Sequence, residues 1–269
     1  MNNSSVQQPQ PKTIGAINVI GLKTLIWREV GRFLNVYSQT IVAPVITTLM
    51  FYTVFALAFG GIERLVGDMP YMTFLAPGLL MMTMVQNSFS NTSSSLVIGK
   101  VQGNIVDVLM PPLSPLEFYL GYTIGGILRG LAVGLATGIT LMVFVDLPVA
   151  HPEIIILYAV LGTMMLSSLG LAAGIWSDKF DHIAAVTNFI VTPLTFLSGT
   201  FYSVSQLPPM WDMLAHYNPF FYMIDGFRYG FIDHADGNIM IGIAVLVVAN
   251  IVLSVLTLSM IRSGYKIKS

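Results

Sequence analysis

Six long apolar segments constrain what this chain can fold into more than any other feature of its sequence. They lie at about residues 38–59, 72–93, 117–145, 153–175, 182–202 and 238–261. Each is long enough to cross a bilayer, because a helix needs about 20 residues to span a hydrocarbon core of about 30 Å. Only 9% of the residues are charged, whereas a soluble domain carries about 25%. We therefore predict an all-α membrane protein with six transmembrane helices.

The Lys and Arg residues between these segments predict which side faces the cytosol, because cytosolic connections are enriched in them. One side of the predicted topology carries only Arg64 and Arg228. The other side carries Lys12, Lys23, Arg28, Arg32, Lys100, Lys179, Arg262, Lys266 and Lys268. Since an even number of spans returns the chain to its starting side, we expect both termini in the cytosol.

The six segments belong to one predicted transmembrane domain over residues 17–262. Residues 1–16 are polar and lack the apolar core of a cleaved signal peptide, so we expect a disordered cytosolic tail there. Residues 263–269 form a second, short cytosolic tail.

The stretch from Leu22 to Tyr37 has the period of an amphipathic helix. Its apolar positions are Leu22, Ile26, Val30, Phe33 and Tyr37, and its opposite side carries Thr24, Arg28, Arg32 and Asn35. We predict an interfacial helix whose basic face meets anionic lipid headgroups. Docking of this face onto a partner protein is the alternative.

A polar-flanked stretch, residues 99–121, connects the second and third apolar segments. We expect an amphipathic helix of about three turns over 100–110, with an apolar stripe formed by Ile105, Val106, Val108 and Leu109. Two readings are open for this helix. Either it transmits movement of a soluble partner to the membrane helices, or it lies on the headgroups as an ordinary loop helix.

Prolines and a capping signal fix the end of this connection. Pro111 and Pro112 stop the short helix, because each disfavours helical backbone at the preceding residue. Ser114, Pro115 and Glu117 match an N-cap, a first-turn proline and the returning carboxylate of a capping box. The third span is therefore predicted to begin at this point.

Polar side chains within the spans are candidates for lining a translocation route. The candidate set is Gln86, Asn87, Asn91, Arg129 and Asn188. Arg129 lies about 15 residues into its helix, or about 20 Å along it, near the middle of the bilayer. No other span has a carboxylate at its middle, so Arg129 has no obvious counterion within the membrane. Two roles are therefore open: Arg129 contacts the substrate, or it bonds to carbonyl and hydroxyl groups of the protein.

Glycines recur every four residues in the third span, at Gly126, Gly130, Gly134 and Gly138. This spacing puts them on one helix face, where a neighbouring backbone can approach closely. A packing seam is expected along this face. The spacing does not tell whether the seam lies inside the subunit or across a dimer.

The region 203–232 has too many charges and prolines for a span and too many aromatic residues for an ordinary loop. We predict two short re-entrant helices that dip into the outer leaflet, with aromatic side chains at the membrane interface. These aromatic residues are Trp211, Tyr217, Phe220, Phe221, Tyr222, Phe227, Tyr229 and Phe231. The region serves as an interfacial anchor or as an exit gate.

The sequence lacks the motifs of several function classes. It contains no GxxxxGK[ST] loop for ATP, no HExxH or GxSxG motif and no paired-histidine zinc pattern. The spans lack the carboxylates that ion-coupled carriers use, and a net charge of −1 gives no indication of nucleic-acid binding. These observations argue against an enzyme, a metal site and a secondary carrier.

Two stretches carry a resemblance to a known family. GNIVDVLMPPLSPLEFYLGYTIGGILRG at 103–130 and FLSGTFYSVSQLPPMWDMLAHYNPFFYMIDGFRYG at 196–230 resemble the ABC-2 type permeases of bacterial ABC exporters. Within that family, the chain is most similar to the permeases grouped with nodulation-factor and drug-resistance exporters. The resemblance implies six spans, an amino-terminal interfacial helix, a coupling helix in the first cytosolic loop and two re-entrant helices before the last span.

The resemblance also implies partners and a function. It implies an inner-membrane dimer of permeases bound to two copies of an ABC ATP-binding subunit, which binds ATP and Mg, so that this chain needs no cofactor. The residues that would contact that subunit are Asn104, Ile105, Val106, Asp107, Val108, Leu109 and Met110. Such permeases export lipids, glycolipids, polysaccharides or drugs. The alternative functions are a membrane anchor that recruits a soluble partner without transport and, less well supported, a membrane enzyme acting on lipid.

Overall fold

The computed structural model describes residues 15, 17–59, 65–66 and 69–267. Within these residues, all regular secondary structure is helical except for one two-stranded antiparallel ribbon, which confirms the predicted all-α class. The elements are α1 (Val19–Leu34), η1 (Ser38–Val42), α2 (Ala43–Phe59), β1 (Leu65–Val66), β2 (Met69–Pro70), α3 (Tyr71–Val101), α4 (Ile105–Leu109), α5 (Pro115–Leu141), α6 (Pro152–Trp176), α7 (Phe180–Val186), η2 (Thr187–Val191), α8 (Thr192–Phe196), η3 (Val204–Gln206), α9 (Pro209–His216), α10 (Pro219–Ile232) and α11 (Ile239–Ser263).

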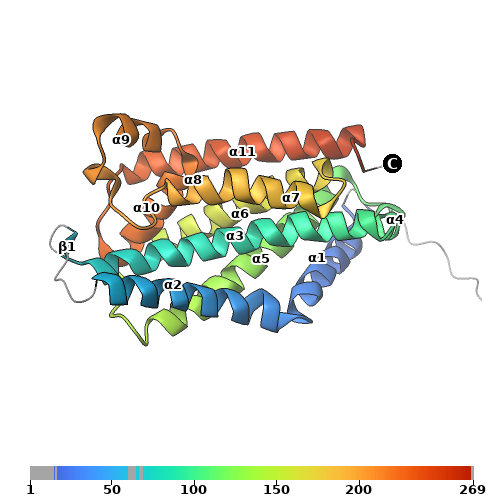
Figure 1. Cartoon of the computed structure of the whole chain (residues 1–269). Coiled ribbons are helices and arrows are strands. Elements are labelled where there is room, and N and C mark those ends of the chain that lie inside the picture. Colours follow the sequence, from blue (N-terminus) through green and yellow to red (C-terminus); the bar gives the residue numbers. More distant parts are fainter. Residues whose placement is uncertain (1–14, 16, 60–64, 67–68, 268–269) are drawn as a thin grey trace, which may run out of the picture.

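The long helices run lengthwise in one bundle with two distinct ends (Figure 1). Helix α3 lies against α5, α6 and α10, and α11 packs on α6. Helices α1 and α4 lie at the same end as the carboxyl terminus, whereas α9 and β1 lie at the opposite end (Figure 1). We call these the inner end and the outer end, after the orientation predicted from the sequence.

Among the described residues, four helices are long and apolar enough to cross a membrane. They are Ser38–Phe59, which joins η1 to α2, and Pro115–Leu141, Pro152–Trp176 and Ile239–Ser263. The predicted second span overlaps α3, which continues eight residues further, and the predicted fifth span overlaps the continuous helical run of α7, η2 and α8, which ends six residues earlier. Helix α3 is less apolar because of its amides and hydroxyls, and the second run is short, so the count of six spans stays a prediction.

The helix expected over 100–110 is much shorter in the structure. Helix α3 continues to Val101, and α4 covers only Ile105–Leu109. Gly103 separates them with a φ of 75°, a left-handed conformation that favours glycine and ends a helix. The prediction of three continuous turns was therefore wrong, because it treated this glycine as helical.

The predicted capping box at the start of α5 is confirmed. The Ser114 hydroxyl accepts a hydrogen bond from the Glu117 N–H at 3.3 Å, and the Glu117 carboxylate accepts the Ser114 N–H at 2.6 Å. The same carboxylate also accepts the N–H of Asn18, which is the N-cap of α1. One side chain therefore joins the starts of α1 and α5.

The glycine row of α5 packs inside the subunit, against α3 and α6. A Cβ at Gly130 would lie 2.9 Å from the Met84 carbonyl oxygen and 2.9 Å from a methyl carbon of Thr163. At Gly138 the nearest atom would be a Leu80 methyl carbon at 3.5 Å, an ordinary contact. The close approach of the helices therefore holds at Gly130 and relaxes by Gly138.

The side of α1 that faces the protein differs from the predicted apolar stripe. The buried side chains are Leu25, Glu29 and Phe33, whereas Tyr37 is exposed. Arg32 does not face outward with the rest of the predicted basic side but bonds to α3. The prediction was wrong for Arg32, which pairs with the buried Glu29, whereas Thr24, Arg28 and Asn35 are exposed as expected.

Most aromatic residues of the predicted interfacial region are buried within the subunit. Helix α10 packs between α3, α6 and α11, which covers Phe220, Phe221, Tyr222, Phe227 and Phe231. Trp211 and Tyr217 remain exposed. The expectation of an aromatic membrane anchor therefore fails for α10 and is limited to α9 and its end.

Candidate functional site

Helix α4 presents apolar side chains in two directions. Ile105 and Val108 are buried in a cluster with Leu25 of α1 and with residues of α5. Val106, Leu109 and Met110 are exposed, the last by 77%. The predicted contact residues Asn104 and Asp107 are also exposed. One face of α4 thus holds it on the bundle, and the other is open at the inner end.

The turn after α4 is tied to the start of α1. The Asn18 side-chain amide donates to the Pro112 carbonyl at 3.3 Å, and the Asn18 backbone is held by Glu117 as described above. A cavity of about 250 Å³ lies between α1 and α4, with Arg28 and Asp107 in its lining. Helix α4 is therefore connected to the first turns of both α1 and α5.

Two lysines at the inner end bond to the end of α6 and to the loop that follows it. Lys100, in the last turn of α3, donates to the Ile175 and Ser177 carbonyls at 2.7 Å each and so caps α6. Lys266 donates to the Asp178 carboxylate at 2.6 Å. This hydrogen bond lowers the pKa of Asp178 and raises that of Lys266. Both contacts fix the loop between α6 and α7.

Arg129 is buried in the bundle with one hydrogen bond. Its side chain is 9% exposed, and its Nη2 donates to the Asn87 amide oxygen at 3.0 Å. Its Nε is buried without a hydrogen-bond partner among the described residues. No carboxylate in the described part of the chain lies within 4 Å of it. The guanidinium therefore keeps N–H donors that have no acceptor among the described residues.

Asn87 also belongs to the lining of a polar pocket. This pocket, about 290 Å³, lies between the η1–α2 helix and α3 and includes Gln86 beside Asn87. Its other polar lining residues are Gln39, Thr47, Thr48 and Thr83. Two of the predicted route residues thus share one pocket, and Arg129 is bonded to one of them.

A second polar cluster joins α1 to α3. The Arg32 guanidinium donates to the Asn91 amide oxygen at 2.8 Å and lies 3.2 Å from a Glu29 carboxylate oxygen. The other Glu29 oxygen accepts the Ser95 hydroxyl at 2.7 Å. Glu29, fully buried, was missed by the sequence analysis. Its position three residues before Arg32 was the available signal, since such pairs share a helix face.

Asn188 is separate from these clusters. It lies on η2 with an exposed side chain, and it does not line the polar pocket. The structure thus brings Gln86, Asn87 and Arg129 together and places Asn91 with Arg32, but it does not gather all five predicted residues.

At the outer end, Arg228 joins several segments, although in the sequence it stands out only as a positive charge on the predicted outer side. Its guanidinium donates to the Phe74 carbonyl at 3.2 Å and to the Gly199 carbonyl at 2.6 Å. It also lies 3.8 Å from the centre of the Phe74 ring, a cation–π contact. Arg228 is 2% exposed. It therefore fixes α10 to α3 and to the turn after α8.

Two carboxylates, Asp225 and Asp236, join further segments at the outer end through hydrogen bonds. Asp225 accepts the backbone N–H groups of Asp236 and Gly237 at 2.9 Å each. Asp236 accepts the Ser203 hydroxyl at 2.7 Å and the Val204 N–H at 2.8 Å. The segments on both sides of α9 and α10 are thereby tied together.

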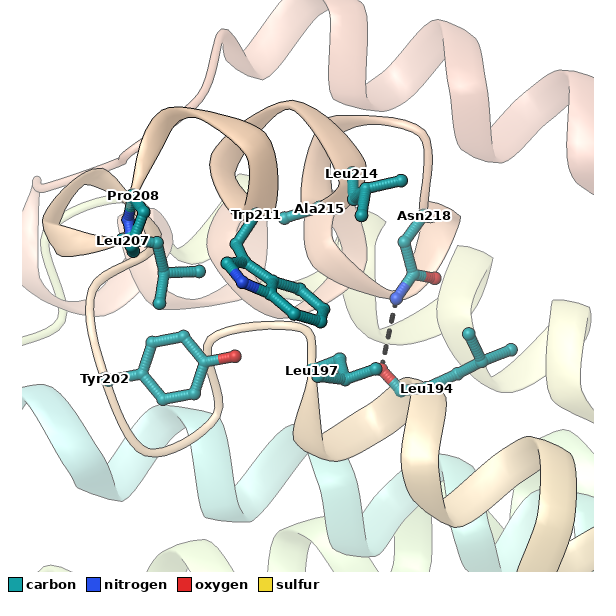
Figure 2. A pocket seen from close by; sticks show the side chains of 9 residues that line it. All are labelled: Leu194, Leu197, Tyr202, Leu207, Pro208, Trp211, Leu214, Ala215 and Asn218. Atoms are coloured by element: carbon teal, nitrogen blue, oxygen red, sulfur yellow. Dashed lines mark hydrogen bonds between the residues drawn. The ribbon is translucent and has the colours of Figure 1, made fainter.

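A mainly apolar cavity of about 590 Å³ lies between α8 and α9 (Figure 2). Tyr202 and Trp211 extend toward it from either side, and Leu214 and Asn218 complete its rim (Figure 2). The Asn218 amide donates to the Leu194 carbonyl at 3.1 Å. This cavity has the size and apolar lining of a small-molecule or lipid-chain site.

Comparison with known proteins agrees with this architecture. The ABC-2 type transporter family matches residues 21–232. The inner membrane transport permease YadH of Escherichia coli strain K12 is 37% identical over 253 residues, which cover 93% of this chain and 98% of that protein. Nodulation protein J of Rhizobium leguminosarum bv. viciae is 25% identical over 99 residues, covering 37% of this chain and 38% of that protein.

Nodulation protein J of Sinorhizobium fredii is 29% identical over 80 residues, 30% of each chain. The full-length relative and the apolar helices indicate an inner-membrane, multi-pass protein. Family membership in turn implies an ABC ATPase partner in general. The chain belongs to the ABC-2 type transporter family of membrane permeases.

Proposed function

We propose that this chain is the permease subunit of an ABC exporter and forms the outward route for a lipid, glycolipid, polysaccharide or drug-like substrate. Two copies pair in the inner membrane, each with six spans, re-entrant helices at the outer end and both termini in the cytosol. Two copies of a separate ABC ATP-binding subunit bind ATP and Mg and supply the energy. The permease itself holds no cofactor.

The open face of α4 carries this proposal. Val106, Leu109 and Met110 form an exposed apolar surface at the tip of the inner end. Exposed apolar groups that project beyond the bundle favour contact with another protein. The adjacent charge of Asp107 suits a partner surface more than an anionic membrane surface. The partner with the chemistry to drive transport is the ATPase that the family implies.

The joint at Glu117 supports a route for force. Ile105 and Val108 attach α4 to the bundle, and Glu117 joins the starts of α1 and α5. A movement of α4 therefore displaces the first turns of both helices together. Helix α5 carries Arg129 about three turns further along, where it meets Asn87 of α3. Closure of the ATPases is thus transmitted to the polar pocket.

The test is a double substitution on the open face, Asp107→Lys with Leu109→Glu. In a reconstituted complex with the ATP-binding subunit, we expect transport to fall at least about tenfold while ATP hydrolysis continues. The control is Val149→Glu, an exposed apolar residue in the loop between α5 and α6, where we expect no change.

Two outcomes would contradict the proposal. Normal transport by the double variant would show that α4 does not couple the subunits. A wild-type complex that binds the ATPase but exports nothing would favour the anchor function. Assembly is checked in each case by co-purification of the two subunits.

A further inference from the structure

We infer that the polar pocket beside Arg129 is a subsite for an anionic group of the phosphate class. This inference rests on the proposed function, because it concerns which substrates the route accepts. It selects anionic amphiphiles over cationic drugs as the substrate class. Its basis is the charge balance of the buried clusters and the hydrogen-bonding state of the pocket lining.

The charge balance singles out Arg129 among the three arginines that bond to α3. Arg32 is paired with the Glu29 carboxylate. Arg228 has two carbonyl acceptors and an aromatic ring. Arg129 has a single amide acceptor within the part of the chain that the structure describes, and its buried Nε is unpartnered. A buried cation with unused donors favours an anion close by.

Asn87 connects this charge to the pocket. Its amide oxygen accepts from Arg129 at 3.0 Å, and its amide nitrogen donates one hydrogen to the Thr83 carbonyl at 3.0 Å. An amide nitrogen has two hydrogens, so one remains for a ligand. Hydrogen bonding to a guanidinium polarises the amide and strengthens that remaining donor.

The rest of the lining adds donors but no opposing charge. The side chains of Gln39 and Gln86 make no hydrogen bond with the described residues, so their amide groups are available to a ligand. The Thr47 and Thr48 hydroxyls donate to carbonyls of their own helix. Among the described residues, no carboxylate lines the pocket. An oxyanion would therefore find donors and a nearby positive charge, whereas a cation would find no counter-charge.

The experiment measures binding by the purified full-length chain in nanodiscs of neutral phosphatidylcholine. The probes are dioctanoyl phosphatidic acid, dioctanoylglycerol, which lacks the phosphate, dodecyltrimethylammonium and inorganic phosphate. We expect the phosphatidic acid to bind at least about tenfold more tightly than the dioctanoylglycerol or the cation. Binding of inorganic phosphate at the same affinity would support the subsite and identify the free ion as its occupant.

Three variants test the assignment to this pocket. Arg129→Gln should lose at least about tenfold in phosphatidic acid affinity, and Arg129→Lys should retain most of it. Asn87→Asp should abolish the preference for the anion, because the new carboxylate pairs with Arg129 and cancels its charge. Asn188→Asp is the matched control, because it makes the same change at an exposed amide outside the pocket, and it should bind as the wild type does.

Unchanged phosphatidic acid binding in both Arg129→Gln and Asn87→Asp would overturn the inference. Equal affinity of the wild type for all amphiphiles would also overturn it. The binding measurement needs neither ATP nor the partner subunit. Failure of transport with anion binding intact would therefore contradict the proposed function alone.

Discussion

Arg129 and Arg228 are both buried guanidinium groups that contact α3, yet their surroundings differ. Arg228 is held by two carbonyls and one ring at the outer end. Arg129 has one amide acceptor and a buried Nε without a partner in the described residues. Burial of an arginine thus does not reveal its role. A guanidinium bonded to two backbone carbonyls fixes the structure, whereas one with an unpartnered buried Nε keeps a donor for a ligand that binds and leaves.

The strongest test of this difference between the two arginines is a matched pair of substitutions, Arg228→Met and Arg129→Met. Methionine keeps much of the side-chain volume and removes the charge. We expect Arg228→Met to cost about 3 kcal/mol or more, because it leaves the buried Phe74 and Gly199 carbonyls without their donor and removes the cation–π contact with Phe74. We expect Arg129→Met to fold and assemble but to lose export.

Both variants are extracted in detergent, and their monodisperse fraction and unfolding temperature are measured. A loss of folded protein in Arg129→Met but not in Arg228→Met would reverse the comparison. Arg129→Lys provides the second readout, since partial recovery of export by a different cation indicates a role for charge.

The packing behind Arg129 gives the next largest effect. Gly130→Ala puts a Cβ 2.9 Å from both the Met84 oxygen and a Thr163 methyl carbon, so α3 or α6 must move. We expect a loss of about 1–3 kcal/mol, the usual cost of overpacking a tight core. Gly138→Ala is the control, because its Cβ finds only an ordinary contact at 3.5 Å. Equal unfolding temperatures for the two variants would show that the seam is not rigid.

The sequence was informative wherever the structure depends on local chemistry. The capping box was predicted at Ser114 because it is formed by residues three positions apart. The apolar segments were predicted because the cost of leaving backbone groups unpaired in lipid forces a helix on each of them.

The sequence was uninformative wherever the structure depends on distant partners. Arg228 meets Phe74, which is 154 positions away, and nothing near either residue indicates the pair. The direction of Arg32 failed for a similar reason, since its acceptor Asn91 is 59 positions away. Gly103 differs, because a glycine between two apolar runs was a local signal of a break and was not used.

A carboxylate at the inner end extends the comparison to anions. Glu117 is buried and accepts N–H groups from Asn18 and Ser114, so it is as well satisfied as Arg228. Glu117→Gln keeps one acceptor oxygen and loses the charge. We expect a loss of about 1 kcal/mol, typical of a weakened helix cap, together with less efficient coupling of ATP hydrolysis to transport.

The matched control is Glu153→Gln, in the first turn of α6, where the carboxylate is mostly exposed. We expect its unfolding temperature and coupling to equal those of the wild type. If both variants behave alike, the joint between α1 and α5 contributes nothing to force transmission.

The smallest effect belongs to the exposed contact between Asp178 and Lys266. Exposed ion pairs are screened by water and stabilise little, so Asp178→Asn should change the unfolding temperature at pH 7 by about 1 °C or less.

The pKa of Asp178 is lowered by Lys266, so the contribution of this carboxylate is complete above its unfolded pKa and is lost as the pH falls through the folded value. The pKa of Lys266 is raised, so its contribution is complete below its ordinary pKa of 10.5 and is lost as the pH rises through the higher folded value. Unfolding temperatures of wild type and Asp178→Asn should therefore differ by a constant amount from pH 5 to pH 9. A difference that grows within this range would show that a further charged group acts on the pair, and that the pair is not an isolated exposed contact.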